Sequence, residues 1–246
     1  MIRKLLGLSG ATLCWWAAAL LIDSPFVLPG PAATLARLGT MTDFALLRAV
    51  LSSVGKVATV LLFVVCLGVG IGVLLGLRPR LYAVFRPVFL SAQAIPVVSW
   101  LAFIVFAFGI GWRGPVFIAV LAFLPQAVFT TVAGVEHLER DLVEMADLYG
   151  VSGPIRWRDL YLGALVPFVR TVVDTVSGGA WKAVLVAEYL CGDEGLGVRI
   201  AWARQTVDVE GVYALSLIAV VLGLCGERCV RWMVRKAGRR WIPFSM

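Results

Sequence analysis

The sequence has few of the residues from which enzymes build active sites. It contains one histidine, His137, and five cysteines whose spacing is of neither the metal-binding nor the redox type. It has no glycine-rich loop followed by Lys and Ser or Thr, so the chain cannot supply P-loop ATPase chemistry by itself. We therefore expect no catalytic site, cofactor, metal or disulfide, and no enzymatic activity in this chain.

Charged residues are also scarce. They make up 15% of the chain, and hydrophobic residues make up 61%, whereas a typical soluble domain has about a quarter charged and about half apolar residues. The formal net charge of +7 is not gathered into a basic face or a recognition motif, so we expect no nucleic-acid partner. The composition predicts an integral membrane protein surrounded by lipid.

Predominantly apolar runs divide the chain into six predicted transmembrane helices within one all-α domain, residues 1–246. Each run is close to the ~20 residues that cross a bilayer. We interpret the first run as a retained span rather than a signal peptide, because no small-residue cleavage site follows it. The predicted spans are residues 5–22, 57–77, 91–111, 114–135, 171–191 and 211–227, with an interfacial helix from Met41 to Lys56 before the second.

Glycines recur at four-residue intervals in the second predicted span, at Gly68, Gly72 and Gly76. This spacing leaves one helix face without side chains, so that another helix can approach closely. Glycine is common in membrane helices in general, but two consecutive four-residue intervals favour close packing.

Polar side chains inside the predicted spans are candidates for lining a translocation path. They are Gln93, Gln126, Lys182 and Glu188. Charges inside a span are costly, so they face the bundle interior, water or one another. Lys182 and Glu188 are six positions apart and cannot pair along one helix. For Gln126 two interpretations stay open, a path residue or a partner for a backbone carbonyl freed by Pro125.

The distribution of basic residues predicts the orientation. With both termini in the cytoplasm, fifteen of the twenty-two Lys and Arg residues lie on the cytoplasmic side, as the positive-inside rule requires. The same orientation makes the long charged loop at residues 136–170 cytoplasmic.

This loop has the pattern of two short amphipathic helices. Leu138, Leu142 and Met145 recur at helical spacing, and Gly150 ends the first helix. Ser152-Gly153-Pro154 then precedes a second helix from about Ile155 to Leu162. Two short amphipathic helices joined by a turn can dock in a groove of a soluble partner. Taken alone, the loop is also compatible with an ordinary interfacial hairpin.

The loop resembles the EAA loop of ABC importer permeases. The matching residues are Glu144-Met145-Ala146, then Gly150 after three residues, Leu160 after nine more, and Leu162-Gly163. Met145 replaces an Ala of the pattern, and Gly163 stands where many relatives have Pro, with Pro167 four residues later. The stretch from Trp181 to Leu190, followed by Gly195-Leu196-Gly197, resembles the branch serving sulfonates, taurine, nitrate, bicarbonate and some vitamin precursors. Together these similarities extend from about Leu46 to Cys229.

The resemblance implies a type I importer-like permease in the bacterial inner membrane, with cytoplasmic coupling helices. It implies three protein partners: ABC ATPase subunits, an external or periplasmic substrate-binding protein, and a second permease copy in a homodimer. The implied solute is a small anion, such as sulfonate, taurine, nitrate or bicarbonate, or a vitamin precursor. The residues implied in ATPase coupling are Glu144, Ala146, Gly150, Ile155, Trp157, Leu160 and Pro167.

From the residues alone, the alternative is a secondary transporter or channel subunit that works without an ATPase. Such a protein should show inverted repeats, broken-helix ion sites or buried acidic relays. We find no convincing repeat in this chain, and its longest predicted cytoplasmic loop has the features of a docking element.

Overall fold

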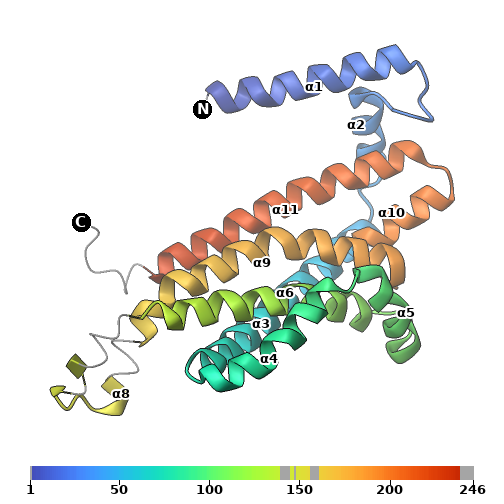
Figure 1. Cartoon of the computed structure of the whole chain (residues 1–246). Coiled ribbons are helices and arrows are strands. Elements are labelled where there is room, and N and C mark those ends of the chain that lie inside the picture. Colours follow the sequence, from blue (N-terminus) through green and yellow to red (C-terminus); the bar gives the residue numbers. More distant parts are fainter. Residues whose placement is uncertain (1, 139–144, 147, 156–160, 239–246) are drawn as a thin grey trace.

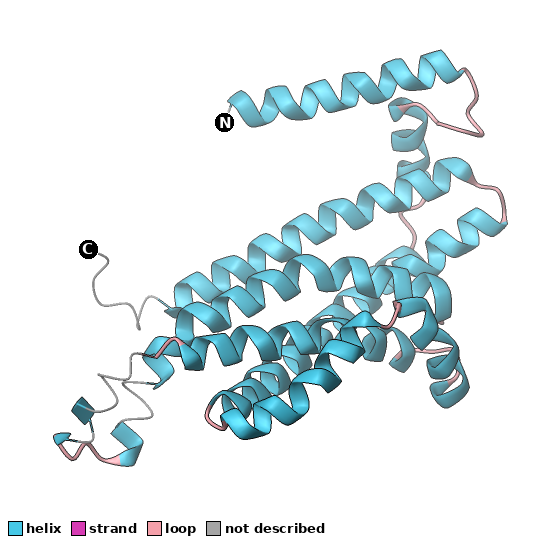
Figure 2. Ribbon diagram, viewed as in Figure 1, coloured by secondary structure: helices cyan, strands magenta, loops and turns pink. Residues whose placement is uncertain are grey.

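The described part of the chain consists of helices and the loops between them (Figure 2). The computed structural model describes residues 2–138, 145–146, 148–155 and 161–238. Its helices are α1 (Ile2–Ile22), α2 (Pro31–Thr40), α3 (Phe44–Gly76), α4 (Pro79–Ala94), α5 (Val97–Phe108), α6 (Arg113–Glu136), α8 (Gly153–Ile155), α9 (Leu162–Cys191), α10 (Leu196–Gln205) and α11 (Val209–Gly238).

Three long helices, α3, α6 and α9, form the centre of the bundle (Figure 1). Small and β-branched side chains dominate their shared core, including Val60 and Val64 on α3, Ala119 on α6, and Val176 and Val184 on α9. Such side chains allow helices to pack closely where lipid removes the hydrophobic driving force. α11 packs on α9 and α10, whereas α1 lies apart from the bundle and is joined to it mainly through α2.

α3 is one continuous helix from Phe44 to Gly76, which corrects the prediction of an interfacial helix ending at Lys56 and a separate span. The Asp43 carboxylate caps it by accepting a hydrogen bond from the Leu46 amide at 2.7 Å. Lys56 indicated a boundary because an unpaired charge is costly within a span. The helix continues through this position because the Lys56 side chain is fully buried and ion-paired.

The glycine stripe of α3 packs directly on α6, as its spacing predicts. A Cβ atom on Gly68 would lie 2.5 Å from the Cβ of Ala127, one on Gly72 would lie 2.5 Å from the Cβ of Thr131, and one on Gly76 would lie 2.7 Å from the Cβ of Val135. Side chains on α3 at these positions would therefore push the two helices apart.

The chain bends sharply within the predicted span at 91–111, because α4 and residues Ser99–Phe108 of α5 meet at an angle of 96°. Pro96 ends the first helix because it forces the residue before it out of the helical conformation. Ile95 accordingly has an extended backbone, with φ −73° and ψ 122°. The proline predicts a kink in this region, but the size of the bend depends on how α5 packs against α6.

Among the helices of the described residues, three have the length and apolar composition of membrane spans: α3, α6 and residues Val209–Val234 of α11. The α4–α5 pair makes a fourth if it crosses as one bent unit, and Ser9–Ile22 of α1 is a shorter apolar helix. α9 is equally long but carries several charged residues, and it begins at Leu162 rather than at the predicted Thr171. The all-helical fold is thus as predicted, while the remaining spans of the predicted six stay predictions.

The segments predicted to be cytoplasmic lie at one end of the bundle (Figure 1). The N-terminal end of α1, the turn between α3 and α4, α8 and the C-terminal end of α11 all lie at the left in this view. α2, α5 and α10 lie at the opposite end. The helix directions therefore agree with the predicted grouping of the basic segments.

The α3–α6 contact yields a testable prediction. Gly72→Ala should destabilise the protein by about 1–3 kcal/mol, because its methyl group overpacks the Thr131 side chain. Gly70→Ala is the matched control, since a Cβ atom there has no neighbour within 4 Å. The measurement is the thermal midpoint of the detergent-purified protein. Equal midpoints for the two variants would contradict the close contact.

Candidate coupling and translocation sites

The predicted coupling segment contains a helix end built around Gly150. Gly150 has φ +61°, the left-handed conformation expected where glycine ends a helix. The Val151 amide donates to the Ala146 carbonyl at 2.9 Å, and the Tyr149 amide donates to the Met145 carbonyl at 3.0 Å. The hydrogen bond from Val151 to Ala146 spans the glycine and satisfies a carbonyl at the end of the helix. The chain reverses its direction sharply there.

Large apolar side chains are exposed around this turn. Leu148 is 87% exposed, Tyr149 81% and Ile155 53%, whereas Ala146 is buried. An exposed apolar group rimmed by polar residues is typical of a protein interaction site. Pro167 lies apart from the turn, inside α9. Glu144, Trp157 and Leu160 lie outside the described residues, so their predicted coupling roles stay predictions.

The four predicted path residues lie in different environments. Gln93 on α4 and Gln126 on α6 have exposed side chains, as does Lys182 on α9. Glu188, further along α9, is 1% exposed. Glu188 is thus enclosed by protein in this structure, and its surroundings explain why a charge is tolerated there.

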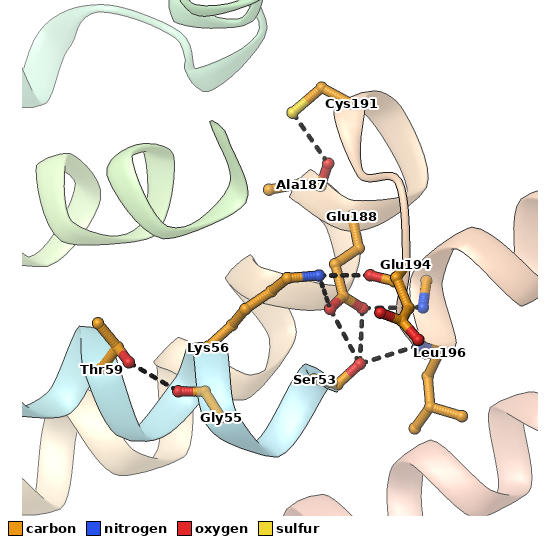
Figure 3. A network of polar contacts seen from close by, with 10 residues as sticks. Ser53, Gly55, Lys56, Thr59, Ala187, Glu188, Cys191, Glu194 and Leu196 are labelled. Atoms are coloured by element: carbon orange, nitrogen blue, oxygen red, sulfur yellow. Dashed lines mark hydrogen bonds and ion pairs between the residues drawn. The ribbon is translucent and has the colours of Figure 1, made fainter. Parts of the chain in front are cut away.

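The Glu188 carboxylate is the centre of a buried polar network that joins α3, α9 and the start of α10 (Figure 3). Lys56 Nζ lies 2.9 Å from Glu188 Oε1, and both side chains are fully buried. Ser53 Oγ donates to Glu188 Oε2 at 2.7 Å and accepts the Leu196 amide at 2.9 Å. The Gly197 amide donates to Glu188 Oε2 at 3.0 Å, and Lys56 Nζ also donates to the Glu194 carbonyl.

Glycines in the loop after α9 allow the backbone to lie directly on this carboxylate. Gly195 has φ +135°, and a Cβ atom there would overlap the carboxylate of Glu188. A Cβ atom on Gly197 would lie 2.7 Å from the Cβ of Glu188. The glycines of the Gly-Leu-Gly sequence are therefore needed because the Gly197 amide reaches Glu188, and the Leu196 amide reaches Ser53, only where no side chain intervenes.

Lys56 was not among the predicted site residues. Its pairing was missed because Glu188 lies 132 positions away in the chain, and no helical periodicity connects two such residues. The available signal was chemical: a lysine and a glutamate in apolar surroundings each need a partner of opposite charge.

A second polar cluster lies at the α2–α10 end and was not predicted. Arg37 on α2 binds Asp208 at 2.6 Å, Arg199 on α10 binds Asp43 at 3.0 Å, and Arg48 on α3 binds Glu194 at 2.5 Å. The hydrogen bond from Arg199 lowers the pKa of Asp43, and that from Arg37 lowers the pKa of Asp208. Apart from Asp43, these residues border a cavity of about 570 Å³ at this end of the bundle.

A groove between α9 and α11 contains Lys182. It has a volume of about 520 Å³ and is lined by Gly178, Trp181 and Lys182 of α9 and by Gly223 and Glu227 of α11, among others. The Trp181 indole donates to the Ala219 carbonyl at 2.8 Å, which joins the two helices on one wall of the groove. Of the four predicted path residues, only Lys182 lies in this groove.

The buried pair yields a prediction about stability. Lys56→Met should destabilise the protein by about 3–5 kcal/mol, because it leaves the Glu188 carboxylate buried without its counter-charge. Lys56→Met combined with Glu188→Gln should recover part of this loss, since the amide needs no ion pair. Lys182→Met is the control, because that side chain is exposed. Thermal midpoints in detergent test the order, and a Lys56→Met midpoint as high as that of Lys182→Met would refute it.

The chain is similar to known transport permeases along most of its length. A family model described as the binding-protein-dependent transport system inner membrane component matches residues 68–239. The taurine transport system permease protein TauC of Escherichia coli strain K12 is 26% identical over 87% of this chain and 81% of its own length. The nitrate import permease protein NrtB of Leptolyngbya laminosa is 26% identical over 76% of this chain and 66% of its own. The riboflavin transport system permease protein RibX of Chloroflexus aurantiacus is 35% identical over 59% and 58%.

The fold is also similar to a solved structure, that of the MetNI methionine ABC transporter in inward-facing conformations. The TM-score is 0.55 at 19% sequence identity, over 76% of this chain and 95% of the matched chain. This similarity supports the helical architecture. Because the family model covers well over half of the chain, the protein is a multi-pass membrane protein that belongs to the inner-membrane components of binding-protein-dependent transport systems, the permeases of ABC importers, in the branch that includes the taurine and nitrate systems.

Proposed function

We propose that this chain is the permease subunit of an ATP-driven importer for a small anionic solute. The observation that carries the proposal is the Gly150 turn, which presents Leu148 and Tyr149 to solvent at the end of the bundle where α6 and α9 meet (Figure 1). In a permease of this family, such an exposed apolar turn suits the groove of a separate ATPase subunit. The solute class is supported by the similarity to the taurine and nitrate permeases.

In this proposal six helical units cross the membrane: α1, α3, the α4–α5 pair, α6, α9 and α11. Two copies of the chain enclose the path, because each chain has one coupling segment and can engage one ATPase subunit. ATP-driven closure of the paired ATPases moves both segments together, and the bundles respond as rigid bodies.

An external binding protein docks at the opposite end of the bundle in this proposal, beside the cluster formed by Arg37, Arg48 and Arg199. Those guanidinium groups are held by carboxylates of the same chain, which keeps the loops of this end in one arrangement. A preorganised surface reduces the ordering cost of binding.

The coupling role of Gly150 can be tested by substitution. Gly150→Val should abolish most of the transport-coupled ATP hydrolysis, because a β-branched residue opposes the positive φ by ~1 kcal/mol or more and displaces the turn. Glu144→Ala should have a weaker effect of the same kind. Gly153→Val is the control within the same segment, since its backbone has no positive φ and a Cβ atom there meets nothing within 4 Å.

The measurements are ATPase pull-down and stimulated hydrolysis, with membrane-fraction yield as the check on insertion. Normal coupling in Gly150→Val would reject this turn as the docking element. A purified chain that transports solute down an ion gradient with no ATPase bound would favour the secondary transporter instead.

The orientation can be tested by thiol labelling in a cysteine-free background. Ser152→Cys should react only from the cytoplasmic side and Asp193→Cys only from the outside, because both side chains are exposed at opposite ends of the bundle. Asp193 is preferred to Gly195, where any side chain would collide with Glu188. Labelling with the sides exchanged would overturn the orientation.

A further inference from the structure

One face of α9 remains open along the length of the helix. Its exposed residues are Thr171, Asp174, Lys182, Val186 and Leu190, which recur every three to four positions, with Gly178 between them. The other faces are covered, since Val172, Val176, Ala180 and Val184 lie in the α3–α6–α9 core, and Trp181 packs toward α11. A central helix thus has one uncovered stripe, and that stripe is partly polar.

Lys182 lies deep within this stripe. It is nine positions from the end of α9 at Cys191, a rise of ~13 Å at 1.5 Å per residue, which approaches half of the ~30 Å hydrocarbon core. A charged side chain at that depth faces water or protein, not lipid tails. The stripe therefore borders water or another protein surface in the assembled transporter.

Two charged residues line the groove; within the described part of the chain Glu227 is ion-paired and Lys182 is not. Arg231 contacts Glu227 directly and lies 3.9 Å from Asp174, so one guanidinium group serves both carboxylates. Within the part of the chain that the structure describes, Lys182 makes no ion pair and no hydrogen bond. Its ammonium group thus retains its capacity to bind an anion.

The space beside Lys182 is large enough for a small solute. The groove volume of about 520 Å³ lies within the range of roughly 300–1,000 Å³ found for ligand pockets. It exists because the helices carry glycine where they face each other: a Cβ atom on Gly223 would lie 2.7 Å from Cδ1 of Trp181, and one on Gly178 would lie 3.2 Å from Oε1 of Glu227. The bonded Trp181 ring forms a fixed wall.

We propose that Lys182 is the residue that holds the anionic group of the solute, a sulfonate, nitrate or carboxylate, as it passes through the α9–α11 groove. This inference rests on the proposed function and names one anion contact within it. An ammonium group suits this task because it is a compact point charge with three donors on a flexible stem, so it can follow a moving oxyanion without a fixed bidentate geometry.

A test that needs no known substrate uses charged thiol reagents on the assembled complex. Val186→Cys, in a cysteine-free background, places a thiol one helical turn from Lys182. We compare its reaction rates with an anionic methanethiosulfonate carrying a sulfonate and a cationic one carrying a trimethylammonium group. Adding Lys182→Met should lower the anionic-to-cationic rate ratio about tenfold, the effect of one unit charge ~6 Å away in water on two probes of opposite sign.

The controls separate this effect from a general change of charge. Arg86→Met, which removes an exposed cation from α4, should leave the ratio unchanged, and Lys182→Arg should preserve it. Absence of reaction with both reagents, or an unchanged ratio after Lys182→Met, would overturn the proposal.

Uptake into proteoliposomes provides the second measurement. Lys182→Met should reduce ATP-driven uptake of taurine or nitrate by about tenfold or more, and Lys182→Arg should retain it. Wild-type uptake of neutral riboflavin but of neither anion would overturn the anion contact. ATPase pull-down on the same preparations separates the two proposals. Charge-dependent labelling without a bound ATPase would refute the importer and keep the anion contact. A bound ATPase without charge-dependent labelling would keep the importer and refute the anion contact.

Discussion

The ion pair between Lys56 and Glu188 is the constraint on which one half of the bundle depends. Neither charge is tolerable alone in an apolar interior, so α3 and α9 must meet in the one register that places them 2.9 Å apart. The Glu188 carboxylate also accepts hydrogen bonds from the Ser53 hydroxyl and the Gly197 amide. This sets where α10 begins, and α10 in turn positions Arg199 against Asp43 at the start of α3. A single buried carboxylate thus organises three helices, α3, α9 and α10.

The other half of the bundle is held together by close packing at glycines rather than by an ion pair. There α3 lies against α6 through glycines, and α6 meets the start of α9 where a Cβ atom on Gly134 would lie 2.6 Å from the Phe168 ring. His137 also packs edge-on against Phe168, at a centroid distance of 5.9 Å. The coupling segment leaves α6 and returns to α9 beside this contact. In the proposed importer, a displacement of this segment would therefore move both helices together, as a rigid-body response requires.

Local features of the fold were predictable from the sequence, and tertiary ones were not. The Gly68 stripe and the left-handed Gly150 were predictable because each depends on spacing or backbone conformation within a few residues. The Lys56 pairing and the right-angled turn after α4 depend on segments far apart in the chain. The continuity of α3 through Lys56 was not predicted for the same reason. A lysine interrupts an apolar run of the sequence, but the helix continues through it because a residue far away in the chain supplies the counter-charge. Gln93 and Gln126 were chosen on polarity alone, which does not indicate the face on which a side chain lies.

The two lysines within apolar helices differ in whether the chain itself supplies a partner for the charge. Lys56 has its counter-charge within the same chain, and its environment is complete. Lys182 lies on the exposed stripe of a helix whose other faces are buried, and the nearby carboxylates are engaged by Arg231. In a membrane that arrangement is stable only if water, another copy of the chain or a solute covers the stripe. The folding of one chain therefore leaves the Lys182 ammonium without a direct partner among the described residues, and in the proposed importer this position within the span allows a contact that forms and breaks with each solute.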